Sequence, residues 1–155
     1  MSDQAQYARL LERMREVPVF SALRFRVDEF SEGLCRMTVP HDRRFDGIYR
    51  SYHGGLLATV ADSSACMAIL TLTGPDEHVT TTDMTIRFLA ACLTDVTAVA
   101  KVIKLGRTLC PVHVELFDAG GRMVAVAQVT YMRLPAAPSH AGRGEATSAS
   151  RRNSE

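Results

Sequence analysis

The chain reads HGGLLATVAD from His53 to Asp62 and stays small or apolar as far as Leu72. Such a run is typical of a helix that is buried on most of its sides. We therefore predict a central helix from about His53 to Thr71, ended by the pair Gly74-Pro75. Asp62 is the one carboxylate in this stretch, and a carboxylate there must be solvated, paired or chemically active.

The composition is that of an ordinary globular domain. Of the 155 residues, 46% are hydrophobic and 23% are charged, and the formal net charge is +1. Basic residues are scattered among acidic ones rather than gathered in a stripe, which argues against nucleic acid as a partner. Any anionic ligand is therefore expected to be small and locally bound.

The ends of the chain differ from its middle. Residues 1–16 carry charges throughout and lack the apolar core of a signal peptide, and the longest apolar run is interrupted by Asp62-Ser63-Ser64. We therefore expect a cytoplasmic protein without a membrane span. Residues 135–155 are rich in Ala, Pro, Ser, Gly and Arg, so we expect residues 1–134 to form one domain and 135–155 a disordered tail.

The cysteines indicate neither disulfides nor a metal site. They lie far apart and match no CxxC pair and no zinc-ligand spacing. We expect all four thiols to be reduced: Cys35, Cys66, Cys92 and Cys110. We expect neither a metal nor a cofactor in this protein.

The remaining elements surround the central helix. Residues 4–17 place apolar side chains at helical spacing and predict an amphipathic helix that ends at Pro18. Alternating or β-rich segments predict six strands, at Arg24–Phe30, Gly33–Pro40, Val79–Leu89, Val96–Leu105, Thr108–Asp118 and Arg122–Leu134. Short turns join most of them. The expected architecture is α+β, with one antiparallel sheet of about six strands packed on one long helix.

The surroundings of Asp62 suggest half of an acyl-transfer site. Its neighbours at i±3 and i±4 on the helix are all small, which leaves room for a ligand: Ala58, Thr59, Ala65 and Cys66. Gly54 and Gly55 leave backbone N–H groups uncovered at the helix start, where they stabilise developing negative charge. A general base and an oxyanion donor thus lie on one helix.

Each of these residues also has a structural interpretation. Asp62 fits a buried carboxylate paired with an arginine or backbone donors, and His53 fits a helix cap or packing residue. Gly54 and Gly55 fit a close helix–sheet contact. Cys66 lies on the Asp62 face, but no histidine is placed by the sequence to activate it as a nucleophile.

The strand that follows the helix adds a second motif. Residues 81–88 read T-x-D-M-x-I-x-F. Strand alternation places Met84, Ile86 and Phe88 on the face that packs on the helix. The same alternation turns Thr81 and Asp83 to the opposite face.

Together, the motif HGG-x6-D and this strand resemble the hotdog-fold acyl-CoA thioesterases of the phenylacetate-degradation type. The resemblance covers about Leu23 to Leu134, with Gly106-Arg107-Thr108 as a weaker second match. It implies a sheet wrapped around the central helix. It also implies a homodimer or dimer of dimers, with each site built across an interface.

The resemblance assigns roles to individual residues. Asp62 corresponds to the catalytic carboxylate, acting as general base for water or as nucleophile, and Gly54 to the helix N-terminal amide that polarises the thioester carbonyl. Thr81 corresponds to a hydroxyl that orients water, with Thr80 or Thr82 as alternatives if the strand is bulged. The implied reaction is hydrolysis of an acyl-CoA to a free acid and CoA.

The chain departs from the family pattern in the loop before the helix. Gly47, beside Asp46, stands where relatives often carry an Asn, and Arg50 stands where they commonly have Gly. We expect Gly55, Asp46, Gly47 and Cys66 to border the substrate. The CoA phosphates are expected near Lys104 and Arg107.

Two other functions fit the same residues. A hotdog dehydratase or hydratase needs a histidine and an acid together, which His53 and Asp62 would supply. A non-catalytic acyl-CoA binding protein is the second alternative, and the missing Asn favours it.

Overall fold

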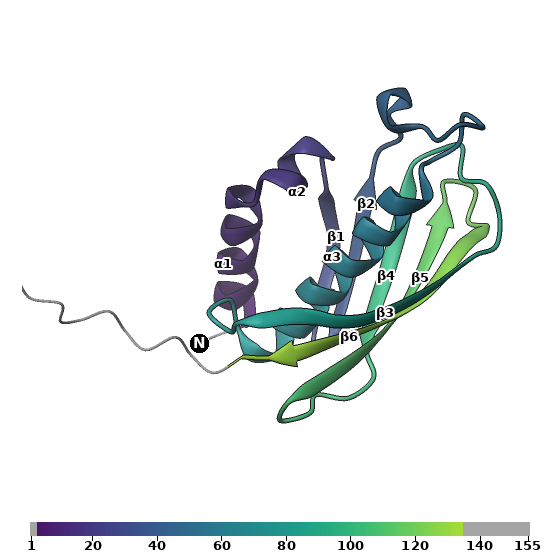
Figure 1. Cartoon of the computed structure of the whole chain (residues 1–155). Coiled ribbons are helices and arrows are strands. Elements are labelled where there is room, and N and C mark those ends of the chain that lie inside the picture. The colour runs from purple at the N-terminus through teal and green to yellow at the C-terminus, as the bar shows by residue number, and fades with distance from the viewer. Residues whose placement is uncertain (1–2, 135–155) are drawn as a thin grey trace, which may run out of the picture.

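A computed structural model describes residues 3–134 of the chain. One antiparallel sheet of six strands, in the order β1-β2-β4-β5-β6-β3, curves around a single long helix, α3 (Figure 1). The expected tail at 135–155 lies outside the described residues. The elements are α1 Asp3–Glu16, α2 Pro18–Ala22, β1 Arg26–Ser31, β2 Leu34–Val39, a 3-10 turn Arg43–Phe45, α3 Gly54–Thr73, β3 Val79–Phe88, β4 Val96–Val102, β5 Leu109–Asp118 and β6 Met123–Arg133.

The central helix begins and ends where the sequence predicts, within two residues. His53 adopts an extended conformation as the N-cap, and its Nδ1 accepts a hydrogen bond from the amide of Gly55 at 3.0 Å. At the other end, Gly74 takes a φ of +95°, a left-handed value that glycine adopts without steric cost.

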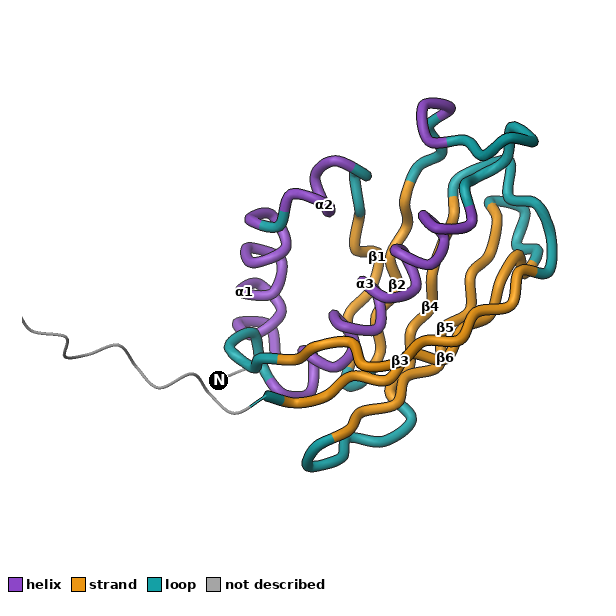
Figure 2. Tube along the Cα trace, viewed as in Figure 1, coloured by secondary structure: helices purple, strands orange, loops and turns teal. Residues whose placement is uncertain are grey.

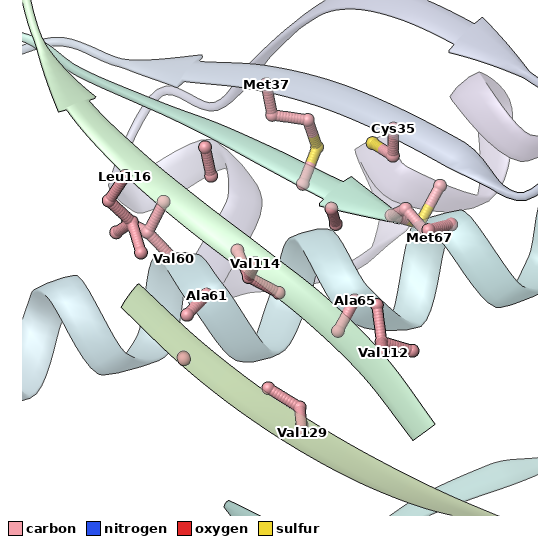
Figure 3. Packing of buried hydrophobic residues seen from close by; sticks show 14 of the residues in the cluster. Cys35, Met37, Val60, Ala61, Ala65, Met67, Val112, Val114, Leu116 and Val129 are labelled. Atoms are coloured by element: carbon pink, nitrogen blue, oxygen red, sulfur yellow. The ribbon is translucent and has the colours of Figure 1, made fainter. Parts of the chain in front are cut away.

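The core lies between α3 and the concave face of the sheet. Alternate residues of β5 are fully buried, and Figure 3 shows three of them, Val112, Val114 and Leu116, directed toward α3. The helix has the length and mean hydropathy, 1.6, of a membrane span, but 56% of that window is buried inside the protein. Its apolar surface is therefore largely used by the core.

The predicted α+β fold with its hotdog arrangement is confirmed, with small differences at element ends. Pro18 does more than end the first helix, because it starts the short helix α2 as its first residue. Arg24 has a φ of +56° as the chain turns back from α2, so β1 begins at Arg26. All four cysteines are free.

The N-terminal helix lies against the C-terminal half of α3 (Figure 2). Gln6 donates to the backbone carbonyls of Leu70 and Thr71, at 3.2 and 2.6 Å. Two side chains on the apolar face of α1, Leu10 and Met14, are buried against the core. The predicted amphipathic helix is thus present, and it covers surface of α3 that the sheet leaves open.

Candidate active site

Asp62 lies in the middle of α3, half-buried, and two side chains bind one of its carboxylate oxygens. Thr81 donates its hydroxyl to Oδ1 at 2.8 Å. Tyr131 donates to the same Oδ1 at 2.8 Å and lies 2.9 Å from the backbone carbonyl oxygen of Asp62. Among the described residues, Oδ2 receives no hydrogen bond. The carboxylate is thus held by one oxygen and free to react through the other.

A bulge in β3 brings Thr81 to the helix. Thr81 pairs with Tyr131 of β6, whereas Asp83 pairs with the adjacent Thr130, so the register shifts between them. The extra residue reverses the alternation, and the expectation that Thr81 faces away from the helix was wrong. Thr82 instead donates to the carbonyl of Thr130 at 3.1 Å, and neither Thr82 nor the exposed Thr80 reaches Asp62.

Tyr131 is the residue that sequence reasoning missed. It is buried, and that burial raises the pKa of its phenol, so the group keeps its proton and serves as a donor. The available signal was its place in the last strand, two positions from the buried Val129 and therefore on the same, helix-facing side. Only the packing of β6 on α3 brings it to Asp62.

A cavity of about 320 Å³ opens beside Asp62, between the N-terminal helices and α3. Most of its walls are apolar. Besides Asp62, Cys66 and Tyr131, three ionisable side chains line the cavity: Arg13, Glu77 and His78. The apolar lining comes from Leu10, Met14, Val17, Val19, Phe20, Met67, Leu70 and Val79.

Gly54 and His53 have separate roles at the helix N-terminus. The Gly55 amide is taken by His53, so the Gly54 amide is the one that no described residue accepts from. Gly54 also lies against Phe88: a Cβ built on it would stand 3.3 Å from the Phe88 ring. Phe88 thus lies against the helix, as predicted, but only at its first residue, and it stays 53% exposed. Met84 and Ile86 pack on the core.

Within one chain, Asp62 does not meet the helix N-terminus. Eight residues of helix separate it from Gly54, a rise of about 12 Å. His53 lies one residue farther away. A single thioester therefore cannot contact the Gly54 amide and the Asp62 carboxylate of the same protomer.

Cys66 lines the same cavity as Asp62, one helical turn later. Burial, followed by the charge of Asp62, raises the pKa of the Cys66 thiol to about 11. A thiol with that pKa stays protonated near neutral pH and is a poor nucleophile. Its position makes it part of the cavity wall.

The loop before α3 is organised by Asp46. Its Oδ1 lies 2.6 Å from Nε2 of His41, and the Gly47 amide donates to the Ser51 carbonyl at 2.8 Å. Asp46 is therefore engaged within the loop. A separate cavity of about 470 Å³ lies at this loop, and its lining residues are His41, Arg43, Asp46, Arg50 and Leu93. It brings Arg50, the departure from the family pattern, into one cavity with Arg43, which sequence reasoning did not single out.

Lys104 and Arg107 are exposed between β4 and β5. Lys104 lines a different cavity, beside Glu32, Gly33 and Leu72, which shares no residue with the cavity of Asp62. Over residues 3–134, no group of three or more His, Cys, Asp or Glu side chains is placed to hold a metal ion.

Known structures share this fold. A thioesterase family protein from Silicibacter pomeroyi superposes with a TM-score of 0.77 at 25% identity, covering 83% of this chain and 98% of its own. The PaaI protein from the phenylacetic acid degradation operon of E. coli gives 0.79 at 21% identity, over 87% and 98%. A thioesterase from Haemophilus influenzae superposes with a TM-score of 0.72 at 22% identity, covering 79% of this chain and 86% of its own.

Comparison of the sequence with curated proteins finds no match. The comparison with family models matches residues 8–132 to the family described as "Domain of unknown function (DUF4442)". That match includes α3, the part of α1 from residue 8 onward, and all of the strands except Arg133 at the end of β6. The chain therefore belongs to the DUF4442 family.

Proposed function

We propose that this protein hydrolyses an acyl-CoA thioester to a free acid and CoA, with Asp62 as general base or nucleophile. The observation that carries the proposal is the half-bound carboxylate. Thr81 and Tyr131 fix one oxygen of Asp62, and the side chain borders a largely apolar cavity able to take an acyl group. Known thioesterases with this fold support the same reaction class.

The chemistry asks little of the protein. As general base, Asp62 takes a proton from water while the water oxygen bonds to the thioester carbonyl carbon. The C–S bond then breaks, and the leaving thiolate takes up a proton. Because a thioester is already activated, one positioned carboxylate and one oxyanion donor can suffice.

The oxyanion donor comes from a second copy of the chain in this proposal. β3 is an edge strand, so its outer backbone groups are unpaired in one protomer. Thr81 and Asp62 lie near its start, whereas Gly54 packs on Phe88 at its end. Antiparallel pairing of two β3 strands about their midpoint would set the Gly54 amide of one copy near the Asp62 carboxylate of the other.

The exposed side chains agree with that pairing. Phe88 and Leu89 are 53% and 56% exposed, and both lie beside the helix N-terminus. Apolar groups exposed next to an unpaired edge strand are typical of a surface that another chain covers. A site built from both copies is proposed, with the phenylacetate-type motif HGG-x6-D supplying its two halves.

A hydratase has less support. His53 would have to act beside Asp62, but it caps the helix about 13 Å away in the same chain. Pairing across β3 could bring the two together, so the product decides between the reactions. Measured turnover of an acyl-CoA would exclude the alternative of a non-catalytic acyl-CoA binding protein.

The test is thiol release from a panel of acyl-CoAs by wild-type protein and by Asp62→Asn. Loss of the carboxylate should lower kcat on the best substrate by on the order of 10² or more. Asp76→Asn is the matched control, because Asp76 pairs with Arg9 at the surface and does not line the cavity. Near-wild-type turnover by folded Asp62→Asn protein would refute the assignment, and tight binding without any turnover would indicate the binding protein.

A further inference from the structure

Two cavities meet at the N-terminal helices. The first, of about 320 Å³, contains Asp62 and lies on the α3 side of these helices. The second, of about 390 Å³, lies on the β1 side, where Leu11, Arg15 and Phe25 line it. Met14 and Phe20 line both cavities, and they are the only residues that do. These two side chains therefore form a wall between them.

The two halves of the wall differ in stiffness. Phe20 packs edge-to-face on Phe25, with 4.8 Å between the ring centroids, and its carbonyl accepts a hydrogen bond from the Phe25 amide at 2.9 Å. Met14 is 6% exposed, and its unbranched side chain has no ring that could stack on a neighbour. A methionine side chain rearranges and can be replaced more readily than a stacked aromatic ring. Met14 is thus the part of this wall that a substitution can remove without disturbing the Phe20–Phe25 contact.

We propose that the first cavity is the acyl pocket and that Met14 is its floor, which selects apolar acyl chains of limited length. This inference rests on the proposed thioester hydrolysis. A thioester whose carbonyl lies at Asp62 can direct its acyl chain along Cys66 and Met67 of α3 and Leu10 of α1 toward Met14. Arg13, which also lines this cavity, is exposed, so its guanidinium can extend into water rather than into the acyl pocket.

Chain-length selection follows from the burial of methylene groups. Each additional buried CH2 raises kcat/KM by roughly fourfold while the pocket has space. Beyond the floor, a longer chain must displace Met14 or fold back into water, so kcat/KM stops rising. The wild-type profile should therefore peak at an intermediate chain, between acetyl and palmitoyl.

The experiment measures kcat/KM for straight-chain acyl-CoAs from acetyl to palmitoyl. Met14→Ala joins the two cavities and should move the optimum to chains longer by about two carbons or more. At about fourfold per CH2, kcat/KM for the chain two carbons beyond the wild-type optimum should rise by up to about 16-fold. Met14→Val, a milder change, should move it in the same direction and guards against misfolding of the alanine variant. Leu11→Ala enlarges only the second cavity and should leave the optimum where it is.

The outcomes separate this inference from the proposed function. An unchanged optimum in folded Met14→Ala and Met14→Val proteins that still release thiol overturns the floor and leaves the hydrolysis standing. If wild-type protein hydrolyses none of the thioesters, the hydrolysis fails. Calorimetric titration with the same acyl-CoAs then tests the floor by itself: a shift of the tightest-binding chain in the Met14 variants supports it, and its absence overturns it.

Discussion

Thr81 and Asp62 are joined by a 2.8 Å hydrogen bond that exists only because β3 contains a bulge. Without the bulge, the hydroxyl would point to the convex face of the sheet and the carboxylate would keep Tyr131 as its one side-chain donor. β-Bulges often redirect a side chain next to a functional site. This one gives Asp62 a fixed orientation with a single free oxygen.

The Thr81 contact predicts a positioning role that can be measured. Thr81→Val keeps the shape of the side chain but removes the donor, so kcat should fall by about tenfold, the lower range for a hydrogen bond to a charged group. The measurement is kcat and KM on the best thioester, with the melting temperature recorded for each variant. Thr80→Val is the control, because Thr80 is exposed on the same strand. An equal loss in both variants would show that the effect belongs to the strand and not to the contact.

The fold could be predicted almost completely from local patterns. The apolar run starting at His53 predicts a helix over residues 53–71, and the structure has it at Gly54–Thr73. All six strands were found within three residues of their ends, because turn residues such as Asp118 and Gly121 separate them clearly. The short helix α2 was missed, since five residues provide too little periodicity.

The site was only partly accessible to the same reasoning. Asp62 stands out by its chemistry, but Tyr131 becomes its partner only when β6 packs on α3, a contact between residues 69 positions apart. The bulge at Thr81 leaves no signal in a run of three threonines, Thr80 to Thr82. Register and bulges depend on tertiary contacts, which a pattern of alternating residues does not encode.

Burial of Cys66 predicts slow alkylation. With its pKa raised from 9.0 to about 11, the thiol has about 100-fold less thiolate near pH 8 than a free cysteine, and only the thiolate reacts. The rate of iodoacetamide labelling at Cys66, followed by peptide mass spectrometry, should therefore be about 100-fold lower than for glutathione and should rise with pH up to about 11. Cys66→Ser should retain turnover. Labelling as fast as that of glutathione, or loss of turnover in the serine variant, would contradict a role confined to the cavity wall.

The Gly54 amide can be removed without removing the helix. Gly54 is the first residue of α3, where proline is well tolerated, and His53 before it already has the extended backbone that a following proline requires. Gly54→Pro should therefore fold and should lower kcat by about 10² to 10³, the usual loss for an oxyanion donor. Gly54→Ala brings a Cβ to the same Phe88 ring but keeps the N–H, so it should retain most of the activity. Similar losses in both variants would mean that crowding against Phe88, rather than the donor, matters.

Mixing two inactive variants then tests whether the site is shared. If Asp62 and Gly54 of one site come from different copies, a mixed dimer of Asp62→Asn and Gly54→Pro chains has one site with both groups intact and one with neither. Equal amounts, unfolded and refolded together, should regain about one quarter of wild-type activity, since about half of the dimers are mixed and each has one working site. A site contained in one chain would regain nothing, because every chain lacks one group. Light scattering of the refolded mixture checks that it is at least dimeric, and a monomeric mass would refute the shared site directly.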